Sequence, residues 1–269
     1  MAAAKQETFT EPRQKTHDKV CRILKITPVQ LYQLIGDSSE YQSNQQKLQE
    51  PDKDKRLNYC RWFQTFIVQN PAILSITRFT DEEWFHLSGY VNSQNSRHWA
   101  IENPHVIHEA PMHPVKIGVW CAISAQRIVG PIFFNQTVNT AEYRLIFMEF
   151  VEQLDDVELS QGYFQQDGAT CHTSNESMEL IASFFDDRII SRNLWPPRSP
   201  DLTTPDFFLW GYLKDRVYAT RPQTLDDLKH ITQEIQAIDN RVLQRVASNM
   251  ERRVELCLMQ DGGHFQHLL

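Results

Sequence analysis

The sequence predicts an α/β protein in which an antiparallel part of the sheet comes first and later strands are joined by helical crossovers. Two observations lead to this prediction. Three candidate strands come early in the folded part of the chain, and helices and strands alternate after them. Hydrophobic residues make up 41% and aromatic residues 11% of the 269 positions, which is enough for a sizeable buried core.

The first part of the chain differs from the rest in composition. Gln, Glu, Lys and Ser cluster between residues 36 and 56, and only residues 20–35 contain an apolar stretch of helical length. We therefore expect residues 1–56 to form a partly flexible region with a linker, and residues 57–269 to form the main domain.

The early elements of the main domain follow from the periodicity of apolar residues. Residues 57–70 show helical spacing, and residues 73–79 predict a strand that ends at Asp81. Residues 115–123 predict the next strand, and residues 128–134 predict its antiparallel hairpin partner. In the strand at 115–123, every second residue is apolar and shares one face: Val115, Ile117, Val119, Cys121 and Ile123.

The later elements alternate between helix and strand. Thr140 is expected to cap a helix, residues 163–166 to form a short strand and residues 175–185 to form a second helix. Residues 189–194 predict the last strand. The helix after it is expected to start at Thr204, with Pro205 and Asp206 in its first two positions.

The C-terminal part is predicted to be helical. Thr224 and Asp227 have the spacing of a capping box. A final helix is expected to end at the two glycines 262 and 263, and its buried stripe comprises Leu243, Val246, Met250 and Val254.

Composition narrows the possible classes of protein. The chain has no apolar run of membrane-spanning length and no secretory signal, so we expect an intracellular protein without a membrane partner. The five cysteines are scattered and include no Cys-x-x-Cys pair, which argues against a disulfide framework and a structural zinc site. We expect them to be reduced thiols in or near the core. The formal net charge of −7 disfavours a nucleic-acid partner unless a specific feature overrides it.

Three acids fall at predicted ends of elements: Asp81, Asp167 and Asp206. Acids at the ends of neighbouring strands of an α/β sheet can share one cleft, which a helix N-terminus can close. Three carboxylates at close range would repel one another by roughly 4 kcal/mol per pair at about 4 Å. A hard divalent cation such as Mg²⁺ relieves this repulsion, and two such ions can promote phosphodiester displacement.

Each acid also has a purely structural interpretation. Asp81 fits an exposed turn or helix start, Asp167 with Gly168 is a common turn dipeptide, and Asp206 suits the first turn of a helix. Residue type and spacing alone therefore leave both a metal site and three structural residues open.

Several long motifs resemble the catalytic domain of mariner-type DNA transposases. They are "RFTDEEWFHLSGYVNSQNSRHW", "HPVKIGVWCAIS", "GPIFF", "FQQDGATCHTS" and "LWPPRSPDLTTPDFFLWGYLKDRVYATRPQTLDDL". The resemblance implies a ribonuclease-H-like mixed sheet flanked by helices. It also implies an enzyme that cleaves DNA and transfers strands with Mg²⁺, for which Mn²⁺ can substitute. It further implies a homodimer when active, a nuclear location and no small-molecule cofactor.

The motifs assign the family's three catalytic, metal-holding acids to Asp81, Asp167 and Asp206 in this sequence. Asp201 lies in the same short motif as Asp206. Because Asp201 follows Ser199 and Pro200 in a turn, we expect it to fix the path of the chain by accepting backbone hydrogen bonds. Asp206 lies in the first turn of a helix anchored by aromatic residues, and we expect it to be the third ligand.

Other residues near these motifs have two interpretations. His172 is more simply a packed or exposed residue than a DNA or active-site contact, and Phe207, Phe208, Trp210 and Tyr212 are most simply core. Residues 90–112, which include Arg97, Trp99 and His105, correspond to a clamp-like insertion in similar transposases or form an ordered surface loop. His105, His108 and His113 lack the spacing of a zinc site.

The resemblance is incomplete at the N-terminus. Only residues 18–36 resemble part of the two helix-turn-helix units that grip transposon ends in the family. We therefore expect a truncated or domesticated transposase that binds DNA weakly and without sequence preference. The alternatives are a non-catalytic nucleic-acid-binding or protein-interaction module derived from a transposase, and a remnant with no activity.

Overall fold

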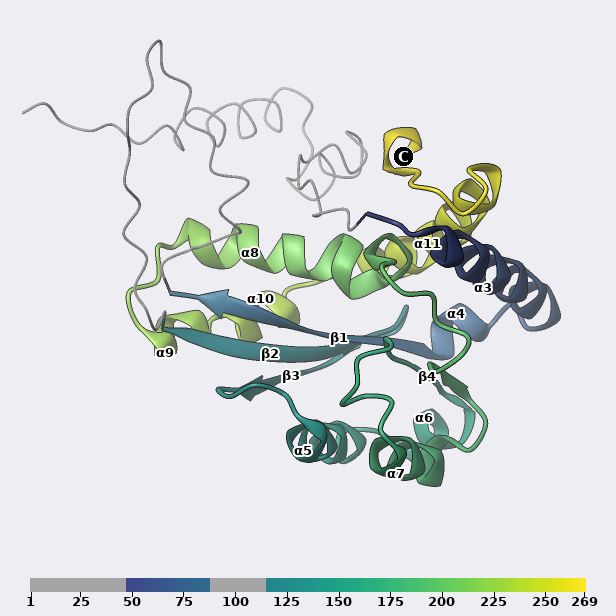
Figure 1. The fold of residues 1–269 in the computed structure, drawn as a ribbon. Helices are drawn as coiled ribbons and strands as arrows, with labels where there is room; N and C mark the ends of the chain where they lie inside the picture. Colours follow the sequence, from purple (N-terminus) through teal and green to yellow (C-terminus); the bar gives the residue numbers. More distant parts are fainter. Residues whose placement is uncertain (1–46, 88–114) are drawn as a thin grey trace, which may run out of the picture. The chain divides into compact units, whose positions relative to one another are not determined.

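A five-stranded mixed sheet with the strand order β3-β2-β1-β4-β5 is the centre of the structure, a computed structural model that describes residues 47–87 and 115–269 (Figure 1). β1 (Thr77–His86), β2 (Lys116–Ile123) and β3 (Ile128–Phe134) are antiparallel neighbours. β4 (Tyr163–Gln165) pairs in parallel with β1 and with β5 (Ile189–Ile190). The predicted change from antiparallel to crossover-linked strands is therefore confirmed.

Contacts divide the chain into two units. The sheet and its helices belong to the unit Gln45–Phe265. The second unit comprises Met1–Asn44 and Gln266–Leu269, and its only described element is a short 3-10 helix, η4 (Gln266–Leu268).

Helices cover both faces of the sheet (Figure 1). One face packs against α5 (Thr140–Val151) and α7 (Asn175–Phe185), with the short α6 (Asp156–Gln161) beside α7. The other face packs against α8 (Trp210–Ala219), α9 (Leu225–Leu228) and α10 (Ile231–Gln236). The long helices α3 (Glu50–Gln69) and α11 (Asn240–Met259) pack on each other and on α4 (Ile73–Ile76).

β2 is buried on both faces because it lies between two strands and two helical layers. Its alternating residues Ile117, Val119 and Cys121 pack toward α8 and α10, as the periodicity predicted. Trp120 and Ala122 point the other way and pack against α5 and α7. The strand therefore contributes to two hydrophobic clusters at once.

The predicted strand at 73–79 is wrong in its position. Its first half forms the helical turn α4, and β1 starts at Thr77 and continues to His86. A short apolar run fits a helical turn as well as a strand, so periodicity could not separate them. Asp81 therefore lies within β1 and not at its end. Strand β4 pairs with β1 only as far as Gln165, which lies opposite Phe79. Asp81 therefore lies just beyond the carboxyl end of β4.

Three other boundaries differ from the predictions. α3 starts at Glu50, seven residues before the predicted start, because its buried side includes the charged residues Asp52 and Arg56. Asn139, and not Thr140, caps α5 by accepting the N–H of Glu142. The last strand, β5, has two residues in place of the six predicted between 189 and 194.

Thr204 does not cap a helix as predicted. It has helical backbone angles and makes no capping hydrogen bond. The chain passes from a 3-10 turn, η2 (Pro200–Leu202), into a π-helical turn, η3 (Pro205–Leu209), which continues directly into α8. π-Turns of this kind are found mostly inside longer helices and often at functional sites.

Other predictions are confirmed. Thr224 and Asp227 form the expected capping box of α9. α11 buries the expected stripe, which comprises Leu243, Val246, Met250 and Val254. Among the cysteines that the structure describes, Cys60, Cys121 and Cys257 are buried free thiols and Cys171 is partly buried. In the described ranges, no helix combines the length and apolar character that crossing a membrane requires.

Candidate active site

Asp81 points from β1 toward the helical layer that contains α8. The indole Nε1 of Trp210, the first residue of α8, donates a hydrogen bond to Oδ2 of Asp81 at 2.7 Å. The surrounding protein removes water from this carboxylate, and the charges of Asp206 and Glu82 lie nearby. The pKa of Asp81 is therefore well above its usual range, although the bond from Trp210 opposes the shift.

Glu82 and Glu83 extend the acidic surface around Asp81. Because side chains alternate along a strand, Glu82 points to the opposite face from Asp81, whereas Glu83 points to the same face. Glu83 forms an ion pair with Lys214 of α8 at 3.0 Å. Oε2 of Glu82 is buried and has no hydrogen-bond partner among the residues described.

Asp167 lies in the loop that follows β4 and is linked to His172. Nδ1 of His172 lies 2.5 Å from Oδ1 of Asp167, and the backbone N–H of Ala169 donates to the same oxygen at 2.9 Å. Partial burial favours the neutral carboxyl group, but His172 and Ala169 outweigh this effect and lower the pKa of Asp167. Asp167 is thus held ionised by its neighbours, in contrast to Asp81.

His172 is buried, with 3% of its surface exposed. Its ring lies against the ring of Tyr143, with centroids 4.1 Å apart, and its Nε2 is 3.3 Å from Oε1 of Glu82. Burial opposes the charged imidazolium, but Tyr143 and Asp167 raise the pKa of His172 well above its usual value. His172 therefore connects the loop of the second acid to the strand of the first.

Asp206 lies in the π-helical turn that leads into α8, where its side chain reaches solvent. Loss of part of its hydration and the charges of Glu83 and Asp167 raise its pKa to about 8. The three predicted acids therefore lie close enough to influence one another's ionisation, although they come from a strand, a loop and a helix start.

The donor set suits a hard divalent cation. Carboxylate oxygens are the ligands that Mg²⁺ and Mn²⁺ prefer, and a cation would relieve the repulsion that raises the pKa values of Asp81 and Asp206. Within residues 47–87 and 115–269, however, no three His, Cys, Asp or Glu side chains converge at metal-coordinating spacing. The side chains thus provide the right chemistry, and to coordinate one cation together they would have to move from the positions described here.

Asp201 has a structural role, as predicted, but through a different partner. Its carboxylate is 4% exposed and accepts two hydrogen bonds of 2.7 Å from the guanidinium of Arg56 in α3. Its backbone carbonyl accepts a bond from Arg253 of α11. Asp201 thus joins α3 and α11 to the segment before Asp206, whereas the prediction was that local backbone N–H groups would hold it.

The four aromatic residues of α8 and its π-turn that were predicted as core differ in burial. Trp210 is buried, while Phe207, Phe208 and Tyr212 are partly exposed. The guanidinium of Arg253 lies 3.8 Å from the ring centroid of Phe207. This stacking fixes the turn that contains Asp206.

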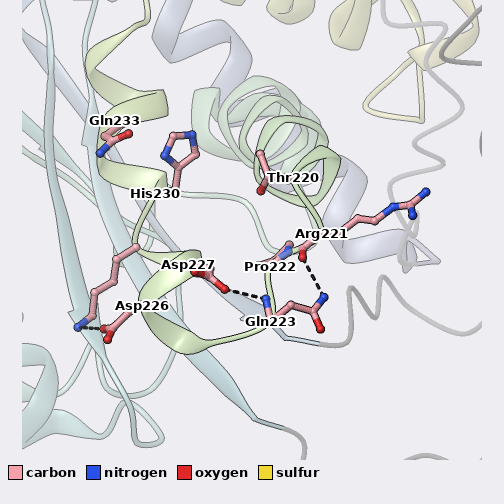
Figure 2. A pocket seen from close by; sticks show the side chains of 9 residues that line it. Thr220, Arg221, Pro222, Gln223, Asp226, Asp227, His230 and Gln233 are labelled. Carbon is pink, nitrogen blue, oxygen red and sulfur yellow. Dashed lines mark hydrogen bonds and ion pairs between the residues drawn. The ribbon is translucent and has the colours of Figure 1, made fainter.

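An open pocket of about 630 Å³ lies elsewhere, between the end of α8 and α10 (Figure 2). None of the three predicted acids lines it. Polar groups within it already have partners: the Asp227 carboxylate accepts the backbone N–H of Gln223, the Gln223 side chain donates to the backbone carbonyl of Arg221, and Lys229 pairs with Asp226. The pocket is lined by the segment that runs from the end of α8 into α10.

Sequence reasoning missed two residues of the site. His172 was assigned to simple packing and Trp210 to the core, yet each bonds one of the three acids. The position of His172 five residues after Asp167, in a loop, was the only signal in the sequence, and Trp210 gave none. Residues 18–36 and 90–112, with Arg97, Trp99 and the histidines 105, 108 and 113, lie outside the described residues.

Comparison with known proteins gives one curated relative. The chain is similar to the transposase of the transposable element Tc3 from Caenorhabditis elegans, with 28% identity over 189 residues. The match includes 69% of this chain and 56% of that protein, so the chain spans just over half the length of the relative. No family model matches the sequence.

Solved structures of the Mos1 transposase share the fold. A paired-end complex with the left transposon end aligns with a TM-score of 0.67 and 16% identity, covering 98% of this chain and 82% of that one. The Mos1 catalytic domain with raltegravir and Mg aligns with a TM-score of 0.65 and 18% identity, covering 82% of this chain and all of that one (100%). The predicted ribonuclease-H-like fold and the resemblance to mariner-type transposase catalytic domains are confirmed.

Proposed function

We propose that this chain is a phosphodiester-transfer enzyme of the transposase type, which cuts DNA and joins strands with the acids Asp81, Asp167 and Asp206. The observation that carries the proposal is a set of contacts that links acids from three separate elements: Trp210, four residues after Asp206, bonds Asp81, and His172 bonds Asp167 and contacts Glu82. The pKa values of Asp81 and Asp206 are raised, so their charged forms destabilise the fold when no cation is bound. Groups with shifted pKa values of this kind cluster at functional sites.

A divalent cation would complete this site. Bound there, Mg²⁺ or Mn²⁺ would activate the attacking hydroxyl and stabilise the leaving oxygen. The side chains of Asp81, Asp167 and Asp206 would hold it, and His172 and Trp210 would keep two of these side chains in place. The Mos1 structures with Mg and with Mn support the use of such ions in proteins of this fold.

DNA is the proposed substrate and partner. Mos1 is bound to transposon ends in several of the similar structures. Because the chain has a formal net charge of −7, we expect low affinity for DNA that falls steeply with salt. A homodimer in the active complex and a nuclear location also belong to this proposal.

Nicking of supercoiled plasmid tests the proposal. We expect the full chain to nick the plasmid in Mg²⁺ or Mn²⁺ and not in EDTA. Asp81→Asn and Asp167→Asn should abolish nicking because they remove a charge and keep the shape of the side chain. Glu149→Gln, an exposed carboxylate of α5, serves as the matched control and should nick like the wild type. A wild-type protein that is folded but does not nick in either metal would favour the alternative of a non-catalytic binding module.

A further inference from the structure

Asp81 and Asp167 are each held through a single carboxylate oxygen. Trp210 bonds Oδ2 of Asp81, while His172 and the backbone of Ala169 both bond Oδ1 of Asp167. In the part of the chain that the structure describes, the other oxygen of each acid accepts no hydrogen bond. Each acid therefore has one oxygen fixed by a nitrogen donor and one oxygen left for a ligand.

His172 is a rigid support because it is fixed on several sides. Its ring packs on Tyr143, and its backbone carbonyl accepts a hydrogen bond from Nε2 of Gln166 at 3.0 Å. Gln166 is fully buried and is itself bonded to Tyr143 and to Ser191. The packing on Tyr143 therefore restricts the ring, and the buried network around Gln166 holds the backbone that carries it.

Trp210 is equally confined. It is 3% exposed and belongs to the hydrophobic cluster between the sheet and α8. Its ring makes an edge contact with Phe85 of β1, with centroids 6.4 Å apart. Since Trp210 lies four residues after Asp206 on the same continuous helix, its bond to Asp81 also ties the strand of the first acid to the helix of the third.

We propose that His172 and Trp210 are positioning residues that preset Asp167 and Asp81 for a divalent cation. The inference rests on the proposed function, because it assumes that these acids hold the ion. The terminal torsion of an Asp side chain is broad, so a carboxylate without a fixed partner samples many orientations. A donor that holds one oxygen reduces this freedom and leaves the second oxygen directed at the ligand.

Two substitutions of His172 separate positioning from simple packing. The amide nitrogen of Asn reaches the place of Nδ1 and can still donate to Asp167, whereas that of Gln reaches the place of Nε2, near Glu82. Mn²⁺ affinity of the full chain, measured from the electron paramagnetic resonance signal of free Mn²⁺, is the readout. We expect His172→Asn to stay within about threefold of the wild type and His172→Gln to bind about 10-fold more weakly.

Trp210→Phe gives the corresponding test for the first acid, because it keeps a large aromatic ring and removes the N–H donor. We expect Mn²⁺ affinity about 10-fold below that of the wild type. The matched controls are Trp62→Phe in α3 and His230→Gln before α10, which lie outside the proposed site and should leave the affinity unchanged.

Several results would overturn the inference. Equal affinities for His172→Asn and His172→Gln, or a wild-type affinity for Trp210→Phe, would show that these residues only pack. If only the inference is wrong, the wild type still binds Mn²⁺ and the Asp167→Asn variant does not. If wild type and Asp167→Asn bind Mn²⁺ equally or not at all, the proposed function fails together with the inference.

A measurement on the wild type covers the case in which the His172 variants do not fold. Proton NMR should show a protected, downfield imidazole N–H proton of His172 that disappears in Asp167→Ala. Absence of this proton in the wild type, or its persistence in Asp167→Ala, would contradict the bond on which the inference depends.

Discussion

At the scale of single residues, Asp81 and Asp167 have opposite effects on stability in the absence of metal. The pKa of Asp81 is raised in the folded state, so its charge at neutral pH destabilises the fold. The pKa of Asp167 is lowered by His172, so its charge stabilises the fold. Asp81→Asn should therefore raise the melting temperature by a few degrees, and Asp167→Asn should lower it. Calorimetry at pH 7 in EDTA measures both shifts, and shifts of the same sign would contradict this assignment.

The second residue-scale prediction concerns the buried pair Arg56 and Asp201. Both side chains are almost completely buried, and breaking such a pair leaves one uncompensated charge. Asp201→Ala should therefore lower the free energy of unfolding by about 3–5 kcal/mol. Urea denaturation measures this loss.

A double substitution provides the control for this pair. Arg56→Met combined with Asp201→Leu removes both charges and should recover a large part of the loss. If Asp201→Ala is as stable as the wild type, the pair does not hold the segment before Asp206.

The sequence identified acids more readily than their supports. Asp81, Asp167 and Asp206 were predicted as ligands because carboxylates in these motifs indicate metal chemistry. His172 and Trp210 were not, because a hydrogen bond to an acid from another element depends on tertiary packing. The same reason explains Asp201, whose partner Arg56 is 145 positions away in the sequence.

At the scale of elements, Gly118 allows β2 and β3 to pair closely. It lies opposite Phe134, and a Cβ at Gly118 would lie 2.1 Å from the ring of Phe134. Phe134 also makes an edge contact with Trp84 on β1, so its ring has little room to move. Gly118→Ala should therefore cost about 1–3 kcal/mol of stability.

Thermal unfolding of a double mutant checks this prediction. Gly118→Ala in a Phe134→Leu background should cost less than in the wild type, because the smaller side chain makes room. An equal cost in both backgrounds would point to a cause other than the contact with Phe134.

Glu158 joins α6 to the sheet and gives the second element-scale prediction. It pairs with Arg78 of β1 and with Arg127 between β2 and β3. Although burial opposes it, Arg127 and the backbone N–H of Asp155 help to lower the pKa of Glu158 to about 2. Its stabilising contribution is therefore complete above pH 4.5 and is lost as the pH falls towards about 2.

Glu158→Gln should remove this pH dependence. We expect the wild type to exceed the variant by on the order of 2 kcal/mol at pH 7, and the difference to vanish near pH 2. Urea denaturation across this range measures it. A difference that stays constant between pH 7 and pH 2 would mean that the charge of Glu158 does not contribute.

Local patterns predicted most elements but not all of their limits. The stripe of α11, the capping box of α9 and the β2–β3 hairpin follow from short-range spacing. The limits of the strand predicted at residues 73–79 did not follow, because a short, mainly apolar run fits a helical turn equally well. The start of α3 was missed because buried charges, which an apolar pattern omits, form its first contacts.

At the scale of the whole molecule, the parallel pairing of β1 with β4 brings the acids together. Asp81 lies just beyond the point where β4 stops pairing, and Asp167 follows two residues after β4. The strand order β3-β2-β1-β4-β5 that produces this arrangement is not encoded in any local pattern. From the sequence, only the motifs that resemble mariner-type transposases indicated it.

Metal-dependent rescue of cysteine variants tests most directly whether the three acids act as ligands of a catalytic cation. A thiolate is a softer ligand than a carboxylate and binds Mg²⁺ poorly, whereas Mn²⁺ accepts it better. Asp81→Cys, Asp167→Cys and Asp206→Cys should each lose plasmid nicking in Mg²⁺ and regain part of it in Mn²⁺, while Glu149→Cys should nick in both. If the three variants nick in Mg²⁺ as the wild type does, these acids do not hold a catalytic metal ion.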